Sequence, residues 1–359
     1  MRNLTRLLCL YALLLSVTFA ESLDETRKKA VAGDARAQSN LGLKYATGES
    51  VPKDSAEAAK WLRKAAEQGH AAAQFNLGLM YSNGDGVPKD SAEAVKWYRN
   101  AAEQGIAEAQ FNLGVRCDNG DGVPKDYAEA VNWYRKAAEQ DIADAQFRLG
   151  VMYDNGNSVP KDSAEAAKWY RKAAEQGHAN AQFNLGLMYA NGNGVPKDPA
   201  EAVKWYRKAA DQGNASAQNN LGLKYATGES VPKDSAEAAK WWRKAAEQGY
   251  AAAQFNLGVL YDDGNGVPKD YAEAVKWYRK AAEQDIADAQ FNLGVRYYNG
   301  EGVPKDLVQA HVWWNIAGAA GHESAKKNLA IVEKQMTDTQ KEKAMDLARE
   351  LFAKQPKKK

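Results

Sequence analysis

The chain has 359 residues, with 48 Lys and Arg balanced by 46 Asp and Glu. Four of the lysines lie in the last six residues, so the rest of the chain has no basic excess, which excludes a typical nucleic-acid-binding protein. Two cysteines, Cys9 and Cys117, are too few for a disulfide-stabilised scaffold.

The first 20 residues have the pattern of a secretory signal peptide. Arg2 and Arg6 give a positive start, residues 7–19 are mostly apolar, and Thr18 and Ala20 are small residues before a cleavage point. The apolar stretch is short for a membrane span, and an uncleaved anchor is the alternative. We therefore expect cleavage after Ala20 and a mature protein that is periplasmic or secreted.

After this segment the sequence repeats itself every 36 residues. The proline of a Val-Pro-Lys-Asp motif occurs at Pro52, Pro88, Pro124, Pro160, Pro196, Pro232, Pro268 and Pro304. Eight copies in constant register predict a repeat array in which each unit contacts its neighbours, rather than a set of separate globular domains.

The predicted organisation has five parts. These are a signal peptide (1–20), an N-terminal capping half-repeat (21–33), eight repeats (34–321), C-terminal capping helices (322–354) and a disordered basic tail (355–359). The half-repeat has Arg27 and Lys28 in register with Arg63 and Lys64, but it lacks the tryptophan and is polar, as an end repeat requires. A weak electrostatic tether to anionic lipid or polymer is the alternative role of the tail.

Each repeat predicts two helices, which we name helix A and helix B. In the second repeat helix A covers about residues 71–82, and Gly84 permits the positive φ that follows its end. Helix B begins at Asp90, with Glu93 at capping-box spacing, and ends near residue 104. Both helices are too short to be stable alone in water, so packing between them must stabilise them.

The apolar residues of each helix fall on one side. They are Ala94, Trp97, Tyr98, Ala101 and Ala102 on helix B, and Ala73, Leu77, Gly78 and Tyr81 on helix A. A glycine inside a helix costs about 1 kcal/mol relative to alanine, and the equivalent of Gly78 recurs in every repeat. We therefore predict close helix contact at Gly78, with Trp97 and Tyr98 filling the space beside it.

The eighth helix B and the helices after it depart from the repeat. The eighth helix B carries Leu307, Val308, Trp313, Trp314 and Ile316. Thr337 and Gln340 have capping-box spacing at the start of the last helix. One face of that helix carries Ala344, Leu347, Ala348, Leu351 and Phe352. This face predicts a cap over the end of the array, with docking of a partner as the alternative.

No residue pattern in the sequence indicates an active site. The histidines His70, His178, His311 and His322 lack metal-ligand spacing, and no phosphate-binding glycine loop or serine nucleophile motif occurs. Cys117 takes the place of Tyr81 and Tyr153 in the neighbouring copies, which predicts a buried small residue, with an intermolecular disulfide as the alternative. We therefore expect neither enzyme activity nor a cofactor or metal.

The repeat resembles the Sel-one-like repeat (SLR) family, which is related to the tetratricopeptide repeat. The shared pattern is Ala-x-Ala-Gln-x-x-Leu-Gly-x-x-Tyr over residues 71–81, Gly-x-Gly-Val over 84–87 and Ala-x-x-Trp-x-x-x-Ala-Ala-x-x-Gly over 94–105. The resemblance covers about residues 30–330. It implies an all-α fold, a right-handed α-solenoid of eight 36-residue helix-turn-helix repeats with terminal capping helices, of the exported bacterial type. The family consists of scaffolds and adaptors, so the resemblance implies binding to other proteins.

One stripe of helix A is polar and changes between repeats, and in related solenoids helix A lines the concave side. The candidate partner-binding residues on this stripe are Asn76, Met80, Asn112, Arg116, Arg148, Met152, Asn184, Met188, Asn292 and Arg296. The asparagines can bond a peptide backbone, the arginines can hold carboxylates, and the methionines are adaptable apolar contacts. An internal asparagine ladder that bonds neighbouring loop backbone is the alternative for the Asn positions.

The sequence thus predicts an exported, non-enzymatic scaffold or adaptor that binds protein or peptide partners in its concave groove, in the envelope or in contact with a host. The alternative is an envelope enzyme or regulator that acts on cell-wall substrates related to peptidoglycan or β-lactams. Structural self-assembly through the end helices is a third hypothesis, although we expect a monomer. We expect no nucleic-acid partner and no integral membrane span.

Overall fold

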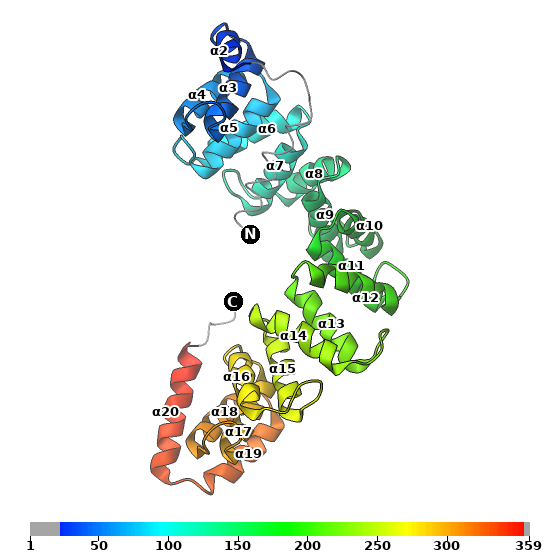
Figure 1. Ribbon diagram of the computed structural model, residues 1–359, viewed down its shortest axis with the longest axis vertical. Helices are drawn as coiled ribbons and strands as arrows, with labels where there is room; N and C mark the ends of the chain where they lie inside the picture. The colour runs from blue at the N-terminus through cyan, green and yellow to red at the C-terminus, as the bar shows by residue number, and fades with distance from the viewer. Residues whose placement is uncertain (1–21, 355–359) are drawn as a thin grey trace. The chain divides into compact units, whose positions relative to one another are not determined.

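A computed structural model describes residues 22–354 of the chain (Figure 1). These residues form nineteen helices, α2 to α20, and no strand. The predicted all-helical fold of eight 36-residue helix-turn-helix repeats is confirmed. The signal-peptide prediction for residues 1–20 and the tail prediction for residues 355–359 lie outside the described residues.

The helices alternate along the chain as predicted. The eight helices A are α3 (Ala35–Thr47), α5 (Ala71–Asn83), α7 (Ala107–Asn119), α9 (Ala143–Asn155), α11 (Ala179–Asn191), α13 (Ala215–Thr227), α15 (Ala251–Asp263) and α17 (Ala287–Asn299). The eight helices B are α4 (Ser55–Glu67), α6 (Ser91–Glu103), α8 (Tyr127–Glu139), α10 (Ser163–Glu175), α12 (Pro199–Asp211), α14 (Ser235–Glu247), α16 (Tyr271–Ala282) and α18 (Leu307–Ala319). The end helices are α2 (Leu23–Val31), α19 (Glu323–Glu333) and α20 (Asp338–Lys354). The chain divides into two compact units, Met1–Lys161 and Asp162–Lys359, which we call unit 1 and unit 2.

An aspartate caps the start of each helix B. In α6 the Asp90 carboxylate accepts hydrogen bonds from the backbone N–H groups of Ala92 (2.9 Å) and Glu93 (3.0 Å). The reciprocal half of the predicted capping box is absent, because the Asp90 N–H already donates to the carbonyl of Tyr81. The Glu93 carboxylate pairs with Lys96 instead. At the start of α20, by contrast, Thr337 and Gln340 make both hydrogen bonds of the predicted box.

The glycine inside each helix A allows helix B to approach closely. A Cβ added to Gly78 would lie 2.7 Å from Cδ1 of Tyr98, so the tyrosine ring fills the space as predicted. The tryptophan beside it does not share this role. In unit 2, Trp241 instead clusters with Val203, Ala209 and Ala210 of the preceding repeat, together with Ala217 and Leu221 of its own helix A. Tyrosine therefore joins the helices of one repeat, and tryptophan joins successive repeats.

Buried glutamines form a hydrogen-bonded ladder that the sequence analysis did not predict. The Gln74 side chain donates to the carbonyl of Ala66 (3.0 Å) and accepts from Nε2 of Gln104 (2.7 Å), the residue that follows the next helix B. The same pair of bonds recurs at Gln38 and Gln110 in unit 1, and at Gln182, Gln218 and Gln254 in unit 2. The Gln290 carbonyl oxygen has no partner among the described residues, because Ala320 stands where the next glutamine would be.

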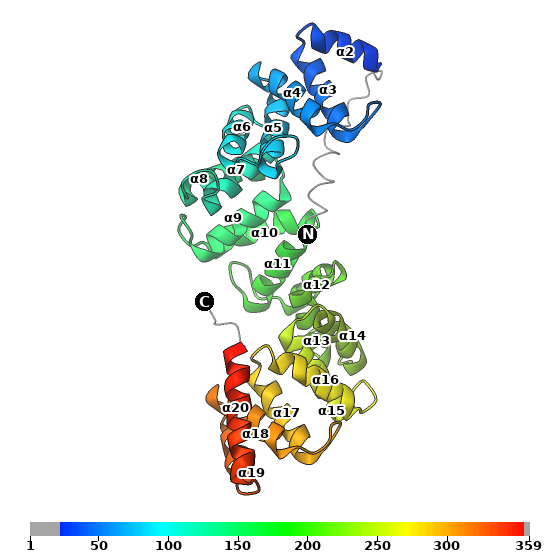
Figure 2. The same ribbon diagram turned by 90° about the vertical axis from the view of Figure 1, so that its left-hand side faces the viewer.

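The last helix packs against α18 rather than continuing the repeat (Figure 2). In α18 the positions of two outer lysines of α16 are taken by Val312 and Ile316, which are buried. These residues form one apolar cluster with Ala344 and Ala348 of α20. The apolar outer face of α18 therefore explains why α20 lies on it.

Candidate functional site

All ten predicted site residues lie on helices A. Unit 1 holds Asn76 and Met80 on α5, Asn112 and Arg116 on α7, and Arg148 and Met152 on α9. Unit 2 holds Asn184 and Met188 on α11, and Asn292 and Arg296 on α17. The structure places them at matching positions of successive repeats, but their exposure differs by residue type.

The three methionines are buried, which corrects the prediction that they form surface contacts. Met80, Met152 and Met188 are only 7, 5 and 4% exposed. Leu260 takes the same position in α15 and is 5% exposed. In unit 2, α11 packs against both α10 and α12, so this side of helix A faces other helices. Spacing along the helix does not show which positions the neighbouring helices cover.

Two of the three arginines bind acidic groups of the same chain. Arg296 forms ion pairs with Asp262 (3.2 Å) and Glu301 (2.5 Å), and its guanidinium lies 4.9 Å from the ring centre of Tyr271. Burial raises the pKa of Asp262, and Arg296 opposes this rise. Arg296 is therefore not free to bind the carboxylate of a partner.

The equivalent arginine, Arg116, is bound in the same way. It pairs with Asp121 in the loop after α7 and with the hydroxyl of Ser82 on α5. At the same repeat position Lys44 pairs with Glu49 (3.3 Å) and Lys224 pairs with Glu229 (2.9 Å). A basic residue here is thus neutralised by the acidic residue five positions later. Of the predicted arginines, only Arg148 is exposed.

The predicted asparagines are half-buried. Asn220 and Asn292 interact with the phenol groups of Tyr206 and Tyr278, which lie on the preceding helix B, and the Tyr278 hydroxyl also donates a hydrogen bond to Asp262 (3.3 Å). Burial raises the pKa of both phenols, and the asparagine bonds oppose this rise. Asn220 and Asn292 therefore interact with side chains of the array, which were not the partners proposed.

Asn76 lacks such a partner. Leu62 occupies the equivalent tyrosine position in the first repeat, and the Asn76 amide nitrogen is buried without a hydrogen bond among the described residues.

A row of aliphatic side chains on helix A remains partly exposed in every repeat. It lies three residues after the asparagine position, and the sequence analysis missed it. We call these residues the aliphatic row: Leu43, Leu79, Val115 and Val151 in unit 1, and Leu187, Leu223, Val259, Val295 and Ile331 in unit 2. Leu223 and Ile331 are 47 and 50% exposed. The signal was available in the sequence, because an aliphatic residue recurs at this position in every copy.

Cys117 is fully buried, as predicted for a small core residue. Burial raises the pKa of its thiol to about 12. In other repeats an arginine bonds the tyrosine found at this position, as Arg135 bonds Tyr153 (2.8 Å). Because Cys117 cannot accept that bond, Arg99 pairs with Glu129 (2.7 Å). A buried thiol of high pKa does not favour a disulfide with a second chain.

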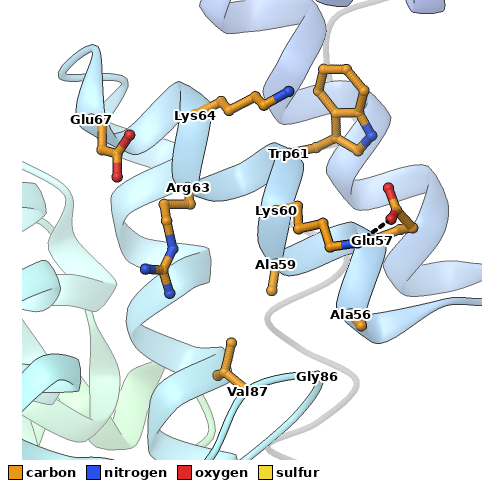
Figure 3. Close-up of a pocket in the computed structure, with 10 residues that line it drawn as sticks. All are labelled: Ala56, Glu57, Ala59, Lys60, Trp61, Arg63, Lys64, Glu67, Gly86 and Val87. Carbon is orange, nitrogen blue, oxygen red and sulfur yellow. Dashed lines mark hydrogen bonds and ion pairs between the residues drawn. The ribbon is translucent and has the colours of Figure 1, made fainter.

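A groove of about 410 Å³ lies on α4 beside Gly86 and Val87 of the next loop (Figure 3). Its cations already have partners within the chain. Lys60 pairs with Glu57 (2.5 Å), and Lys64 lies 4.2 Å from the ring centre of Trp61. Arg63 bonds the hydroxyl of Tyr81, so the groove presents no unpaired positive charge from these three residues.

The described residues were also compared with the requirements of a metal site and of a membrane-spanning helix. Within residues 22–354, no three His, Cys, Asp or Glu side chains are grouped so that they could hold a metal ion. No helix in that part of the chain combines the length and apolar character of a membrane span.

Comparison with known proteins places these features in a family. The family profile described as the Sel1 repeat matches residues 35–70, 71–106, 107–142, 143–178, 179–214, 215–250, 251–286 and 287–322. No curated protein matches the chain.

The chain is also similar to several solved structures. A Sel1 repeat protein from Oxalobacter formigenes is 35% identical, with a TM-score of 0.65 over 86% of this chain and 89% of that chain. A protective antigen of uropathogenic Escherichia coli strains that displays an SLR fold is 34% identical, with a TM-score of 0.36 over 93% of this chain and 95% of that chain. The immunity protein Pa5087 from Pseudomonas aeruginosa is 24% identical, with a TM-score of 0.36 over 60% of this chain and 82% of that chain. The eight matched repeats and the relative from Oxalobacter show that the chain belongs to the Sel1 repeat family of protein-interaction scaffolds.

Proposed function

We propose that this protein is an exported, non-enzymatic scaffold that binds protein or peptide partners through the exposed faces of its helices A. The single observation that carries the proposal is the aliphatic row, which stays partly exposed on successive helices A. Exposed apolar side chains aligned over many repeats are typical of a surface that another protein covers.

The outer faces of helices B are less suited to partner binding than helices A, because their lysines already have partners within the chain. In unit 2, Lys168, Lys204, Lys240 and Lys276 each pair with the glutamate three residues earlier. A second lysine in α10, α12, α14 and α16 stacks on the tryptophan, as Lys208 does on Trp205 at 4.1 Å. Exposed pairs of this kind contribute little to stability or affinity, so the outer face favours solvation over recognition.

Site-specific photocrosslinking in the producing cell tests the proposal. A photoreactive amino acid at Leu223, the 47% exposed member of the aliphatic row on α13, is compared with the same amino acid at Lys204, on the outer face of α12. We expect protein adducts at Leu223 and few at Lys204. Adducts only at Lys204 would contradict the helix A assignment. Turnover of purified peptidoglycan by the protein would contradict the non-enzymatic role.

Export is a separate part of the proposal, supported by the residue pattern of positions 1–20. Cell fractionation followed by mass spectrometry of the purified protein tests it. We expect a periplasmic or released protein whose first residue is Glu21. A cytoplasmic protein that retains residues 1–20 would contradict export.

A further inference from the structure

We infer that Asn193 and Asn265 are sites of spontaneous deamidation in the folded protein. Each is followed by a glycine in a loop of unit 2, Gly194 in one loop and Gly266 in the other. Asparagine is chemically labile, and a following glycine makes it more so, because no Cβ hinders attack by the glycine backbone nitrogen. The reaction needs only water and no partner, so it is independent of the proposed function.

Deamidation begins when the backbone nitrogen of the glycine attacks the side-chain carbonyl carbon of the asparagine. A C–N bond forms, the attacking nitrogen gives up its proton, and the side-chain amide leaves as ammonia. Water then opens the cyclic imide at either of its carbonyl groups, which gives aspartate or isoaspartate without oxidation or reduction. The attack requires a glycine N–H that is not held in a hydrogen bond, and the fold determines which glycines meet this requirement.

Seven Asn-Gly pairs occur in the sequence, and five of them lie at the ends of helices A. In these five the asparagine is the last helical residue: Asn83, Asn119, Asn155, Asn191 and Asn299. The glycine N–H that follows donates to a carbonyl of the last helical turn, as Gly192 does to Met188 (2.8 Å). Attack at these five asparagines therefore requires the helix end to open first.

The pair at Asn193 lies just beyond the end of α11. The carbonyl oxygen of Met188 accepts the N–H groups of both Gly192 and Asn193, at 2.8 and 3.1 Å. The next N–H, that of Gly194, forms no hydrogen bond with another group of residues 22–354. Asn193 and Gly194 are both exposed, so water reaches the reacting groups.

The loop after α15 has the same arrangement. The carbonyl oxygen of Leu260 accepts from the N–H groups of Gly264 (2.9 Å) and Asn265 (3.1 Å). The N–H of Gly266 has no such partner in the described part of the chain, and Asn265 is exposed. Because the same backbone geometry occurs in two loops, the reactivity follows from the structure of the loop.

The contacts of these loops make the glycine necessary. Gly194 has a φ of +68°, and a Cβ there would overlap the carbonyl oxygen of Ser163 at the start of α10. Gly266 has a φ of +75°, and a Cβ there would overlap the main chain of Ser235. Only the asparagine of each pair can therefore vary without strain. In five other repeats an acidic residue takes its place: Glu49, Asp85, Asp121, Glu229 and Glu301.

The two products differ in what they do to the loop. Aspartate at position 193 or 265 reproduces the acidic residue of those other repeats, so the loop accommodates it. Isoaspartate lengthens the main chain and displaces the following glycine from its contact with the preceding helix B. Accumulation of isoaspartate should therefore loosen the contact between successive repeats at these loops.

Ageing of the purified full-length protein tests the inference. The protein is incubated at mildly alkaline pH, digested with trypsin in heavy-oxygen water to mark conversion during digestion, and analysed by tandem mass spectrometry. Asn191 is the matched control for Asn193, because both precede glycine and both lie in the tryptic peptide 173–197. We expect Asn193 to convert about tenfold faster or more than Asn191, because attack at Asn191 requires a helix end to open.

A parallel incubation in denaturant removes the protection of the helix ends, so Asn193 and Asn191 should then convert at similar rates. Asn265 and Asn299 provide a second comparison of the same kind in unit 2. Equal rates at Asn193 and Asn191 in the folded protein would overturn the inference. Conversion of Asn193 only in denaturant would also overturn it, because the contact of Gly194 with Ser163 would then hold the loop too rigidly for attack.

Discussion

Residues 40–61 and residues 220–241 are identical in sequence but have different neighbours. The first segment lies in the first repeat, beside the short helix α2, and the second lies in the sixth repeat, beside the full helix α12. Their helices A end at the same type of left-handed glycine, Gly48 and Gly228. Their helices B begin at the same type of capping aspartate, Asp54 and Asp234. Local sequence therefore determines where the helices begin and end.

Burial, by contrast, depends on the neighbouring repeat. Trp241 is 7% exposed because it packs on residues of α12, whereas Trp61 is half-buried and borders the groove on α4 (Figure 3). Outside the identical segment, Leu62 faces Gly42 where Trp242 faces Gly222. The same residues thus contribute different amounts to stability in the two copies.

The largest predicted effect is the difference between two tryptophan truncations. Trp241→Ala should cost about 3–5 kcal/mol of local stability, because it leaves a cavity between repeats. Trp61→Ala should cost about 1–2 kcal/mol, because less apolar surface is withdrawn from water in the wild type. Amide hydrogen exchange in the affected helices measures both, since a repeat array need not unfold in one step. Equal losses would show that α2 covers Trp61 as completely as α12 covers Trp241.

The next effect concerns the packing glycines. A Cβ at Gly222 would lie 2.7 Å from Trp242, whose Nε1 is bonded to the carbonyl of Asn219, so Gly222→Ala should cost about 1–3 kcal/mol. A Cβ at Gly42 would lie 2.8 Å from Cγ of Leu62 and 3.1 Å from both the carbonyl oxygen of Ala58 and the backbone nitrogen of Leu62, so the main chain of α4 would have to move. Gly42→Ala should therefore cost about 1–3 kcal/mol as well, although alanine itself favours the helix by about 1 kcal/mol. Thermal denaturation measures both losses, and a neutral Gly42→Ala would contradict the close-contact argument.

The fold was predictable because its causes are local and repeated. The 36-residue period, the aspartate at the start of helix B and the glycine in helix A each depend on nearby residues, and all three were confirmed. The glutamine ladder was not predicted, because Gln74 and Gln104 are thirty positions apart and no local pattern connects them.

The candidate site was less predictable, because exposure and pairing depend on other helices. Helical spacing placed Met188 on the same stripe as Asn184, yet the helices on either side of α11 bury the methionine. Arg296 was expected to be free, but it pairs with Asp262 of the preceding helix A and with Glu301 of the next loop. Partners of this kind become visible only when the repeats are stacked.

The third prediction concerns Leu62, which occupies the position of the packing tyrosine in the first repeat. Leu62→Tyr should stabilise the first repeat by about 1 kcal/mol, because the new phenol can bond the unpartnered amide of Asn76 as Tyr206 bonds Asn220. A tyrosine or tryptophan already lies against the equivalent glycine in later repeats, at Gly78, Gly114, Gly186, Gly222, Gly258 and Gly294. Chemical denaturation measures the gain. Leu62→Phe is the matched control, because it adds the ring without the hydroxyl, and equal gains for both variants would contradict the hydrogen-bond argument.

The smallest predicted effect is a pH response that only the first of the two copies has. After the first repeat, His70 caps α5 by accepting a hydrogen bond from the Ala73 N–H at Nδ1 (3.2 Å). After the sixth repeat, Tyr250 stands at this position and makes no side-chain cap. Burial lowers the pKa of His70, and Arg36 acts in the same direction while Asp34 opposes it. A protonated ring cannot accept the capping bond.

Because the folded protein binds this proton more weakly than the unfolded chain does, the contribution of His70 is complete above its ordinary pKa of 6.5 and is lost as the pH falls below that value. The loss should not exceed about 1 kcal/mol, the usual contribution of an N-cap. His70→Asn keeps the cap without the titration, since Asn214 accepts from the Ala217 N–H at the same repeat position (2.8 Å). Hydrogen exchange at Ala73, corrected for intrinsic rates, should therefore accelerate at acidic pH in the wild type and not in the variant. The Ala253 amide, which follows Tyr250, should show no such change in either protein, and an equal response at both amides would mean that the pH dependence arises elsewhere.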